Sequence, residues 1–486
     1  MMQVDVTPLS VLVISSLFSP LIIIFSRQFR IDKLAGAYTS LVFLYALISS
    51  YTFIFIPETL RISLLGGSSS LAILQIDQLS SYMTLIVLGI ALASSIYSLG
   101  YIHERIPEFY SLLLLLTTGM VGVFYSGDLL TFFVFWELMS ISSYILVAFN
   151  YREWEAVEAS LKYLIMSSTG SAAILFGVSL IYGMTGTLVI SEVAARMTSQ
   201  TAAHEIWSIA GLVFIIGGLG VNVAMVPFHS WLPDAHPAAP SPISAMLSGV
   251  VIKTGVYAMY RLLTMVYPPS MYSWQLGLML LSILTMTIGN LMAALQTDIK
   301  RLLAFSSIAN MGYIVFALSI GTELGLSGGL LHVMNHAVSK SLLFLAAGSF
   351  IHASGTRNLE EMAGIAKRMP ISGISYSIGA FSLAGVPGLN AFISEYTIII
   401  SAFEAGLHIL AAIMLINVII GAMYHLRVVQ IIFVKPETEA SSRCREPGIS
   451  IITPLILLSI FSILIGVYAS PFLETARGVA LTLLNR

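Results

Sequence analysis

The sequence contains little charge and almost no cysteine for its length. Of its 486 residues, 9% are Asp, Glu, Lys or Arg, whereas a soluble domain carries about 25%. Its single cysteine, Cys444, excludes a disulfide framework and a cysteine-ligated cluster within the chain. The formal net charge of −2, without a basic or acidic tail, gives no reason to expect a nucleic-acid partner. No glycine-rich phosphate loop is visible, so we expect no bound nucleotide or redox cofactor.

Long apolar runs take the place of that charge. Hydrophobic residues make up 57% of the chain, and the mean hydropathy is +0.92. The apolar run 9–25 has no basic segment before it and no small-residue cleavage pattern after it. We therefore interpret this run as a first span rather than as a removable signal. The composition predicts an integral membrane protein.

A bilayer core about 30 Å thick needs roughly 20 apolar residues in a helix. By that measure we predict an all-α membrane protein with about fourteen transmembrane helices. The expected spans are 8–26, 34–56, 79–100, 110–126, 128–149, 156–185, 208–226, 240–264, 275–296, 301–321, 327–351, 371–406, 408–433 and 450–472.

The lysines and arginines of the loops predict the orientation. Loops after the odd-numbered spans hold about 14 of them, including Arg27, Arg152, Arg301, Arg357 and Lys435, whereas the other loops hold about five. The positive-inside rule then places the basic loops in the cytoplasm and both termini outside. We expect a multi-pass protein of the cell membrane, surrounded by lipid.

Ionisable side chains interrupt spans that should be apolar: Glu137, Lys162, Lys253, His332, His336, Lys340 and Glu395. In the segment HVMNHAVSK, His332, His336 and Lys340 are spaced by four residues, so they share one helical stripe. A lysine or aspartate at the centre of a span costs about 2.5–3.5 kcal/mol, so such groups usually pair, face water or titrate. The pattern indicates an ion or proton path.

Each of these side chains also has a structural interpretation. Lys162 lies only about two turns from the basic end of its span, where it could snorkel to the interface. Glu137 and Lys253 could form a structural ion pair, and the histidines could bond neighbouring backbone groups. A metal site is disfavoured, because Lys340 continues the stripe as a cation and no third ligand is near in sequence.

Two prolines break otherwise apolar runs. Pro227 lies in MVPFHSW at the end of the seventh span, and Pro387 lies in GVPGLN inside the twelfth. A broken helix frees backbone groups that only a polar cavity can satisfy, and such breaks point to transport paths. Spans 7 and 12 differ by five, an odd number, so consecutive five-helix copies must have opposite topology. We predict an inverted repeat of spans 4–8 and 9–13.

Four long motifs carry a resemblance to a known family. They are MVPFHSWLPDAHPAAPSPISAMLSGVVIKTGVYAMYR, LQTDIKRLLAFSSIANMGY, HVMNHAVSKSLLFLAAGSFI and LAGVPGLNAFISEY, in this order. Over residues 100–435 the chain resembles the antiporter-like subunits of respiratory complex I, membrane-bound hydrogenases and Mrp-type sodium/proton antiporters. The resemblance implies a central chain of polar residues that carries protons in the membrane plane between two half-channels.

The resemblance also implies roles for single residues. Glu137 resembles the family's fifth-helix glutamate, which pairs with a lysine on the seventh helix, and Lys253 resembles the connecting eighth-helix lysine. The stripe His332, His336 and Lys340 resembles the eleventh-helix relay, and Glu395 occupies the terminal position on the twelfth. Lys162 and Asn222 complete the candidate path.

Asn222 departs from the family pattern. The resemblance implies a lysine five residues before the proline of VPFH, but this sequence has Asn222 there. Asparagine does not titrate. We therefore expect Glu137 to lack a lysine partner from the seventh helix, and the first half-channel to be altered or inactive unless Lys253 or another residue compensates.

The expected function is proton translocation, with sodium as an alternative ion, in a multi-subunit membrane redox complex. We expect flanking helices over 1–100, a first repeat over 101–265, a second over 266–435, and a loop and last helix over 436–486. Expected partners are other membrane subunits, including further antiporter-like subunits and a redox module that carries out electron transfer. The alternatives are a subunit of an Mrp-type antiporter and a structural subunit that has lost transport.

Overall fold

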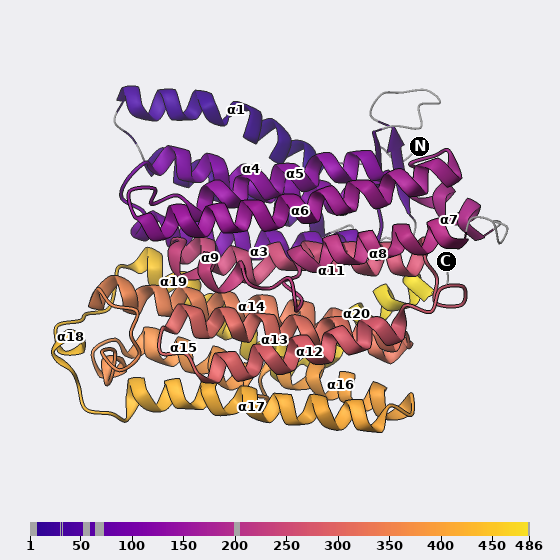
Figure 1. Cartoon of the computed structure of the whole chain (residues 1–486). Helices are drawn as coiled ribbons and strands as arrows, with labels where there is room; N and C mark the ends of the chain where they lie inside the picture. Colours follow the sequence, from indigo (N-terminus) through magenta and orange to yellow (C-terminus); the bar gives the residue numbers. More distant parts are fainter. Residues whose placement is uncertain are drawn as a thin grey trace.

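The computed structural model describes residues 7–29, 31, 33–51, 59–63, 72–198 and 205–484. It is a bundle of long helices that run alongside one another (Figure 1). Within these residues, 13 helices are long and apolar enough to cross a membrane. They are α1 (Thr7–Phe29), α2 (Lys33–Tyr51), α3 (Gln78–Tyr101), α4 (Ile106–Tyr125), α5 (Leu129–Val147), α6 (Trp154–Thr185), α8 (Glu205–Asn222), the joined helix Ser241–Met265, α12 (Gln275–Ala294), α13 (Ile299–Ile320), α14 (Glu323–Ser354), α17 (His408–Phe433) and α19 (Ile449–Val467).

Both predicted helix breaks are confirmed. The twelfth span consists of two shorter helices, α15 (Pro370–Leu383) and α16 (Asn390–Glu404), with Pro387 between them. The seventh span stops at Asn222, and the chain resumes as α9 (Leu232–Ala238) beyond Pro227. Counting the broken twelfth span with the other 13 gives the predicted fourteen, and the all-α membrane fold is confirmed.

The eighth span also contains an irregular turn. It starts as α10 (Ser241–Met246), passes through one π-helical turn (Leu247–Val251) and continues as α11 (Ile252–Met265). π-Helical turns in α-helices are rare and are frequent at functional sites. This one ends two residues before Lys253.

Several elements were not predicted. They are the antiparallel hairpin of β1 (Leu60–Ser63) and β2 (Ile73–Ile76), the short helices α7 (Ile190–Thr198) and α18 (Glu439–Ser442), a 3-10 turn (Ile365–Lys367) and α20 (Ala469–Leu484). The predicted last span, 450–472, is wrong at its end, because α19 stops at Val467 and α20 then packs against α14 and α3. Pro471 explains the restart, since proline is tolerated in the first turn of a helix.

Capping residues fix the ends of the two central helices. The side chain of Asp298 caps the start of α13, and Thr322 caps the start of α14. Gly321 and Gly355 end these helices with φ values of +73°, which residues with a Cβ rarely adopt. With 32 residues, α14 is about 48 Å long, so it extends beyond a hydrocarbon core of about 30 Å.

One backbone arrangement occurs twice. Isolated strand bridges join Asp128 to Val189 and Asp298 to Asn358. Each aspartate also accepts hydrogen bonds from two backbone N–H groups in the first turn of the following helix, α5 or α13. Asp128 follows the fourth span and Asp298 the ninth, so the two arrangements lie on opposite faces. This recurrence is what an inverted repeat requires.

We call the face that carries the loops after α1, α3, α5, α9, α12, α14 and α17 the basic face. Ion pairs join distant elements there: Arg27–Glu108, Lys162–Asp234, Arg301–Asp234, Arg357–Glu155, Arg357–Asp298, Arg368–Glu437 and Lys435–Glu360. Burial opposes the charge of Arg357, but its hydrogen bonds with Glu155 and the nearby Asp298 raise its pKa overall. Arg357 is therefore a permanent cation.

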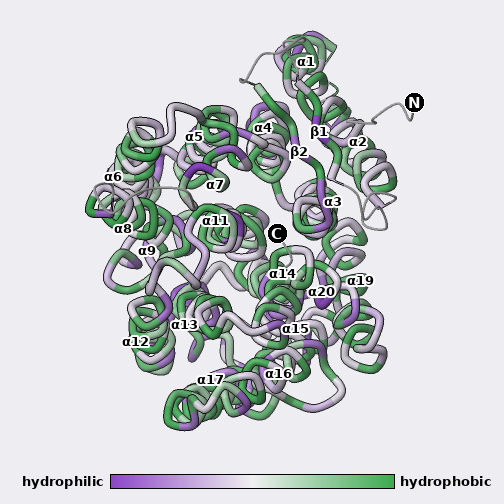
Figure 2. The backbone as a smooth tube through the Cα atoms, turned by 90° about the vertical axis from the view of Figure 1, so that its right-hand side faces the viewer, coloured by the Kyte–Doolittle hydropathy of each residue, from purple (hydrophilic) through white to green (hydrophobic). Residues whose placement is uncertain are grey.

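The most deeply buried spans lie near the centre of the bundle. In the end-on view of Figure 2, α14 lies near the middle, with α1 and α17 at the rim. The joined helix Ser241–Met265 is buried except at its end, and α13 is nearly all buried, whereas only about a third of α1 and of α17 is buried. A polar side chain on α13 or α14 must therefore find its partners within the protein.

Candidate functional site

The predicted stripe on α14 is fully enclosed. His332, His336 and Lys340 have no exposed surface. One ring nitrogen of His332 lies 2.9 Å from Ser394 Oγ on α16, and the other lies 3.0 Å from Asn310 Oδ1 on α13. The ring centroids of His332 and His336 are 6.1 Å apart. The stripe therefore faces protein, as expected, and not lipid.

A chain of polar atoms links Lys340 to the eighth span. The carbonyl of Leu303 accepts a hydrogen bond from Lys340 Nζ at 3.2 Å and one from Ser307 Oγ at 2.8 Å. The hydroxyls of Ser307 and Ser248 are 2.6 Å apart. Lys253 Nζ in turn donates to the carbonyl of Ser248 at 2.5 Å, within the π-helical turn. Lys253 and Lys340 are thus linked by polar groups of Ser248 in the π-helical turn and of Ser307 and Leu303 in α13.

Glu395 lies on α16, just after the break in the twelfth span, and is 3% exposed. A Cβ atom at Gly385 would lie only 3.1 Å from its Oε2, so the glycine of the break leaves space for the carboxylate. Ser394, the residue before Glu395, lies 2.9 Å from a ring nitrogen of His332 through its hydroxyl, and Tyr313 packs against the same ring. Glu395 therefore lies at the end of the same polar line.

Side chains form hydrogen bonds with the backbone carbonyls that the helix breaks leave without a partner in the helix. Asn335 on α14 donates to the carbonyl of Asn390 at 2.6 Å, and Asn390 donates to the carbonyl of Asn335 at 3.1 Å. At the other break, Trp231 donates to the carbonyl of Val221 at 2.8 Å. The breaks are therefore built into the protein rather than exposed to lipid.

The first half of the predicted path is less complete. Glu137 on α5 is half-buried, and its Oε1 has no hydrogen-bond partner among the described residues. No ion pair of Glu137 occurs in that part of the chain. Asn222 at the end of α8 accepts a hydrogen bond from the N–H of Gly255 at 3.0 Å, whereas its Nδ2 has no partner within the described ranges. Asn222 thus contacts α11, and Glu137 lacks the lysine that the family pattern implies.

Lys162 lies apart from the buried line. Its side chain is 50% exposed, and its Nζ lies 2.8 Å from Glu158 and 3.0 Å from Asp234. This is the interfacial placement that its distance from the end of the span allows.

The sequence analysis did not identify a second polar cluster, on α12, α13 and α17. A ring nitrogen of His425 lies 3.1 Å from Ser306 Oγ, and the Tyr424 hydroxyl lies within hydrogen-bond distance of two acceptors, Ser306 Oγ at 2.9 Å and Asn290 Oδ1 at 3.0 Å. His425 has no exposed surface, and its ring packs against that of Tyr424 with 4.7 Å between centroids. A single histidine in the apolar run GAMYHLRVV was the only available signal.

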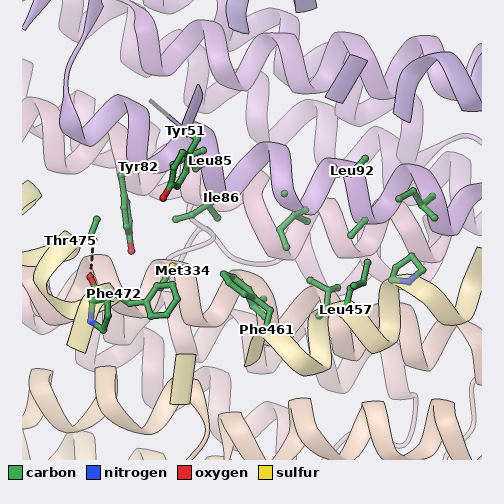
Figure 3. A pocket seen from close by; sticks show the side chains of 18 residues that line it. Tyr51, Tyr82, Leu85, Ile86, Leu92, Met334, Leu457, Phe461, Phe472 and Thr475 are labelled. Atoms are coloured by element: carbon green, nitrogen blue, oxygen red, sulfur yellow. Dashed lines mark hydrogen bonds between the residues drawn. The ribbon is translucent and has the colours of Figure 1, made fainter. Parts of the chain in front are cut away.

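The described residues offer no obvious cofactor site. No group of three or more His, Cys, Asp or Glu side chains among them could hold a metal ion. A cavity of about 680 Å³ lies between α3, α14, α19 and α20 (Figure 3), but its lining is apolar. The hydroxyl of Tyr82 in its wall already donates to the carbonyl of Leu330 at 2.9 Å. This cavity does not belong to the polar line.

Family models match most of the chain. Residues 126–421 match the family described as NADH:quinone oxidoreductase/Mrp antiporter, TM. Residues 66–110 match the N-terminus of complex I chain 5, NADH-ubiquinone oxidoreductase.

Curated relatives are similar over most of their length. The chain is 32% identical to NADH-quinone oxidoreductase subunit N of Desulforudis audaxviator over 428 residues, which cover 84% of each chain. It is 33% identical to F(420)H(2) dehydrogenase subunit N of Methanosarcina mazei over 422 residues, 84% of this chain and 85% of the relative.

Solved structures share the fold. A chain of the archaeal membrane-bound sulfane sulfur reductase has a TM-score of 0.88 and 32% identity, with 98% and 97% of the two chains covered. A chain of the Mrp complex from Dietzia has a TM-score of 0.91 at 23% identity, with 100% and 98% covered, a likeness of fold alone. The chain thus belongs to the family of membrane subunits common to NADH:quinone oxidoreductases and Mrp antiporters.

Proposed function

We propose that this chain translocates protons as the antiporter-like subunit of a multi-subunit membrane complex. The observation that carries the proposal is the buried line from Lys253 through Lys340, His336 and His332 to Glu395. Each of these side chains can gain or lose a proton, and hydroxyls and carbonyls lie between Lys253 and Lys340. Neither ring nitrogen of His336 has a hydrogen-bond partner among the described residues, so both are available to a proton. Charges this deep in a membrane protein are costly and usually mark ion or proton paths.

The line offers proton transfer in short steps. The hydroxyls of Ser248 and Ser307 lie between Lys253 and Lys340, whose ammonium groups donate to the neighbouring carbonyls of Ser248 and Leu303. Water beside these hydroxyls would carry the proton that Lys253 releases to the amine of Lys340, which then passes a proton to His336 and His332 on the same helix face. Histidine is suited to this role because it can accept a proton at one ring nitrogen and release it from the other. Glu395 is the last acceptor of the line.

The second repeat, 266–435, carries most of the translocation in this proposal. Glu137 without a cationic partner does not form the charge switch that the family pattern implies. The first repeat, 101–265, would then use Glu137, Asn222 and Lys162 mainly for its stability and less for proton transfer.

The surroundings of the chain complete the proposal. The basic face is cytoplasmic and both termini are outside the cell membrane, because cytoplasmic loops carry an excess of Lys and Arg. The partners are further membrane subunits, including antiporter-like ones, and a redox module that drives transport. The names of the similar dehydrogenase and sulfane sulfur reductase chains support a redox module. Sodium is the alternative ion.

The test compares Lys340→Ala with Lys367→Met in the complex purified with its partner subunits and reconstituted into vesicles. Lys367 is an exposed lysine of the basic face and serves as the matched control. We expect Lys340→Ala to lower proton pumping by about a hundredfold at equal assembly, because the line loses a proton carrier, and Lys367→Met to pump normally. Normal pumping by Lys340→Ala would instead indicate a structural subunit. Co-purification with only ion-transport subunits would identify an Mrp-type antiporter.

A further inference from the structure

A cavity of about 680 Å³ lies between α3, α14, α19 and α20 (Figure 3). Its lining residues on α14 are Met334 and Val338. Each lies two residues from a member of the stripe His332, His336 and Lys340, which is about half a turn around a helix. The body of α14 therefore separates this space, which we call the apolar cavity, from the proposed proton path.

The walls of the apolar cavity offer almost nothing to a polar ligand. Apart from the hydroxyls of Tyr51, Tyr82 and Thr475, the side chains that line it are apolar. The hydroxyl of Tyr82 donates to the carbonyl of Leu330 at 2.9 Å, and that of Thr475 donates to the carbonyl of Pro471 at 2.8 Å. A buried water needs about two to four polar partners, so a molecule that fills this space must be apolar.

The three residues with hydroxyl groups lie toward one end of the cavity. Tyr51 is the last residue of α2, Tyr82 lies near the start of α3 and Thr475 lies in α20, whereas Leu92 and Leu457 lie toward the other end (Figure 3). The polar end is nearer the face opposite the basic face, because α3 ends at the basic face. Tyrosines are enriched where a membrane protein crosses the interface. The cavity thus has the polarity of a lipid, with a polar end at the interface and an apolar remainder.

The cavity is long and narrow. Its lining residues on α3 run from Tyr82 to Ile96, which is about 21 Å along a helix that rises about 1.5 Å per residue. The volume spread over that length gives a mean cross-section of about 30 Å². A helix is about 10–12 Å across with its side chains, so its cross-section is roughly 80 Å² or more. A helix of a partner subunit or of a second copy is therefore too wide, whereas an extended hydrocarbon chain fits.

The cavity is continuous with the surface that faces the bilayer. Leu457 of α19 lines it and is 55% exposed, and Phe461, one turn further along the helix, also lines it and is exposed. The same helix presents Ile460 and Leu464 to its surroundings. Lipid chains that cover α19 therefore reach the cavity without crossing a polar surface.

We infer that the apolar cavity binds one hydrocarbon chain of a membrane lipid, with the lipid headgroup at the end marked by Tyr82 and Thr475. The chain enters from the bilayer past α19 and lies against Met334 and Val338. Atoms that line an empty cavity lose dispersion contacts, and the chain restores them. The lipid thereby supports α14 from the side opposite the stripe. The inference goes beyond the proposed function and does not depend on which ion is translocated.

The first experiment asks whether a lipid chain reaches α14. The complex, purified with its partner subunits, is reconstituted into vesicles of phosphatidylethanolamine and phosphatidylglycerol that contain a phosphatidylcholine with a diazirine in one acyl chain. After irradiation, peptide mass spectrometry identifies the labelled residues. We expect label on Met334 and Val338, because they are only 7% and 3% exposed and the cavity gives a lipid chain access to them. Absence of label from both residues would overturn the inference.

A variant that fills the cavity sharpens this experiment. Gly89 of α3 lines the cavity, and a Cβ atom there would meet nothing within 4 Å beyond its own helix backbone, so Gly89→Leu places a side chain in the open space. We expect the label on Met334 to fall by about tenfold in Gly89→Leu, because the leucine takes the volume that the chain needs. Gly217→Leu on α8 is the matched control, since a Cβ atom there also meets nothing within 4 Å and Gly217 does not line the cavity. Equal labelling of Met334 in the two variants would contradict the inference.

A second experiment identifies the bound molecule without a labelled lipid. Native mass spectrometry counts and weighs the small molecules that the detergent-purified complex retains. We expect the parent and Gly217→Leu to retain one more phospholipid per copy of this chain than Gly89→Leu does. If the molecule lost in Gly89→Leu has the mass of a quinone, a quinone tail and not a lipid chain fills the cavity. Equal retention in all three proteins would mean that the cavity binds no lipid, and either result overturns the inference.

Discussion

The two repeats share a scaffold but differ in their charges. Each repeat has a helix-capping aspartate that also forms an isolated strand bridge. Each also has a 32-residue helix, α6 or α14, and a broken helix. The three ionisable residues in the middle of α14, His332, His336 and Lys340, are all buried, whereas Lys162 of α6 reaches the surface. The comparison teaches that a repeat can keep the backbone fold of a half-channel without keeping the row of buried ionisable side chains on its long helix.

The surroundings of the two long helices account for the difference. α14 is packed on all sides by α3, α10, α13, α15, α16, α19 and α20. More of α6 is exposed, and its outer face meets lipid. A lysine on α14 must exchange its proton with other side chains, whereas a lysine on α6 can extend to the interface and pair there.

The largest difference between the halves is expected from a pair of matched carboxylate variants. Glu395→Gln should lower proton pumping by about tenfold or more, because an amide does not accept a proton at the end of the line. Glu137→Gln, the same change in the other half, should leave pumping within about twofold. Both are measured as pumping per assembled complex. A larger loss in Glu137→Gln than in Glu395→Gln would assign translocation to the first repeat.

A smaller effect is expected from restoring the missing cation. Unit charges 4 Å apart attract by about 4 kcal/mol at an effective dielectric of 20, so Asn222→Lys can supply the charge that Glu137 lacks. In this background we expect Glu137→Gln to reduce pumping by about threefold to tenfold, whereas in the parent it does not. The double-mutant cycle measures the coupling. If the effects of Asn222→Lys and Glu137→Gln on pumping are simply additive, the difference in function between the two halves depends on more than the residue at position 222.

The smallest effect is expected for Lys162. Because its side chain is half exposed and pairs with Glu158 and Asp234 at the surface, Lys162→Met should leave pumping within about twofold. Raising the salt concentration should have little further effect, since an exposed pair is already screened. Lys367→Met serves again as the surface control. A strong pumping defect in Lys162→Met alone would return this lysine to the path.

Much of the fold could be predicted from the sequence, because its signals are local. Fourteen apolar runs gave the spans, and Pro227 and Pro387 gave the breaks, since proline removes a backbone donor and clashes within a helix. The end of the last span was misplaced, because hydropathy does not reveal the non-helical residue Tyr468 between two apolar helices. The β1–β2 hairpin lies outside any span, where hydropathy carries no signal.

The candidate site was predicted only where charge stands out against an apolar run. Lys253, Lys340 and Glu395 could be found in this way, and the spacing of four residues placed His332 and His336 on one stripe with Lys340. His425 was missed because a single histidine is also a common core residue.

Arg357 joins the two halves at the basic face. Its guanidinium pairs with Glu155 of the first repeat at 3.0 Å and with Asp298 of the second at 3.2 Å, and it donates to the carbonyl of Pro237 at 3.1 Å. Arg357 itself belongs to the second repeat, so its contacts with Glu155 and with Pro237 of α9 hold the two halves together. Parting the halves on this side would break both contacts at once and leave the permanent cation with Asp298 alone. The two halves therefore stay joined at the basic face, and an ion that enters there passes between helices that do not separate.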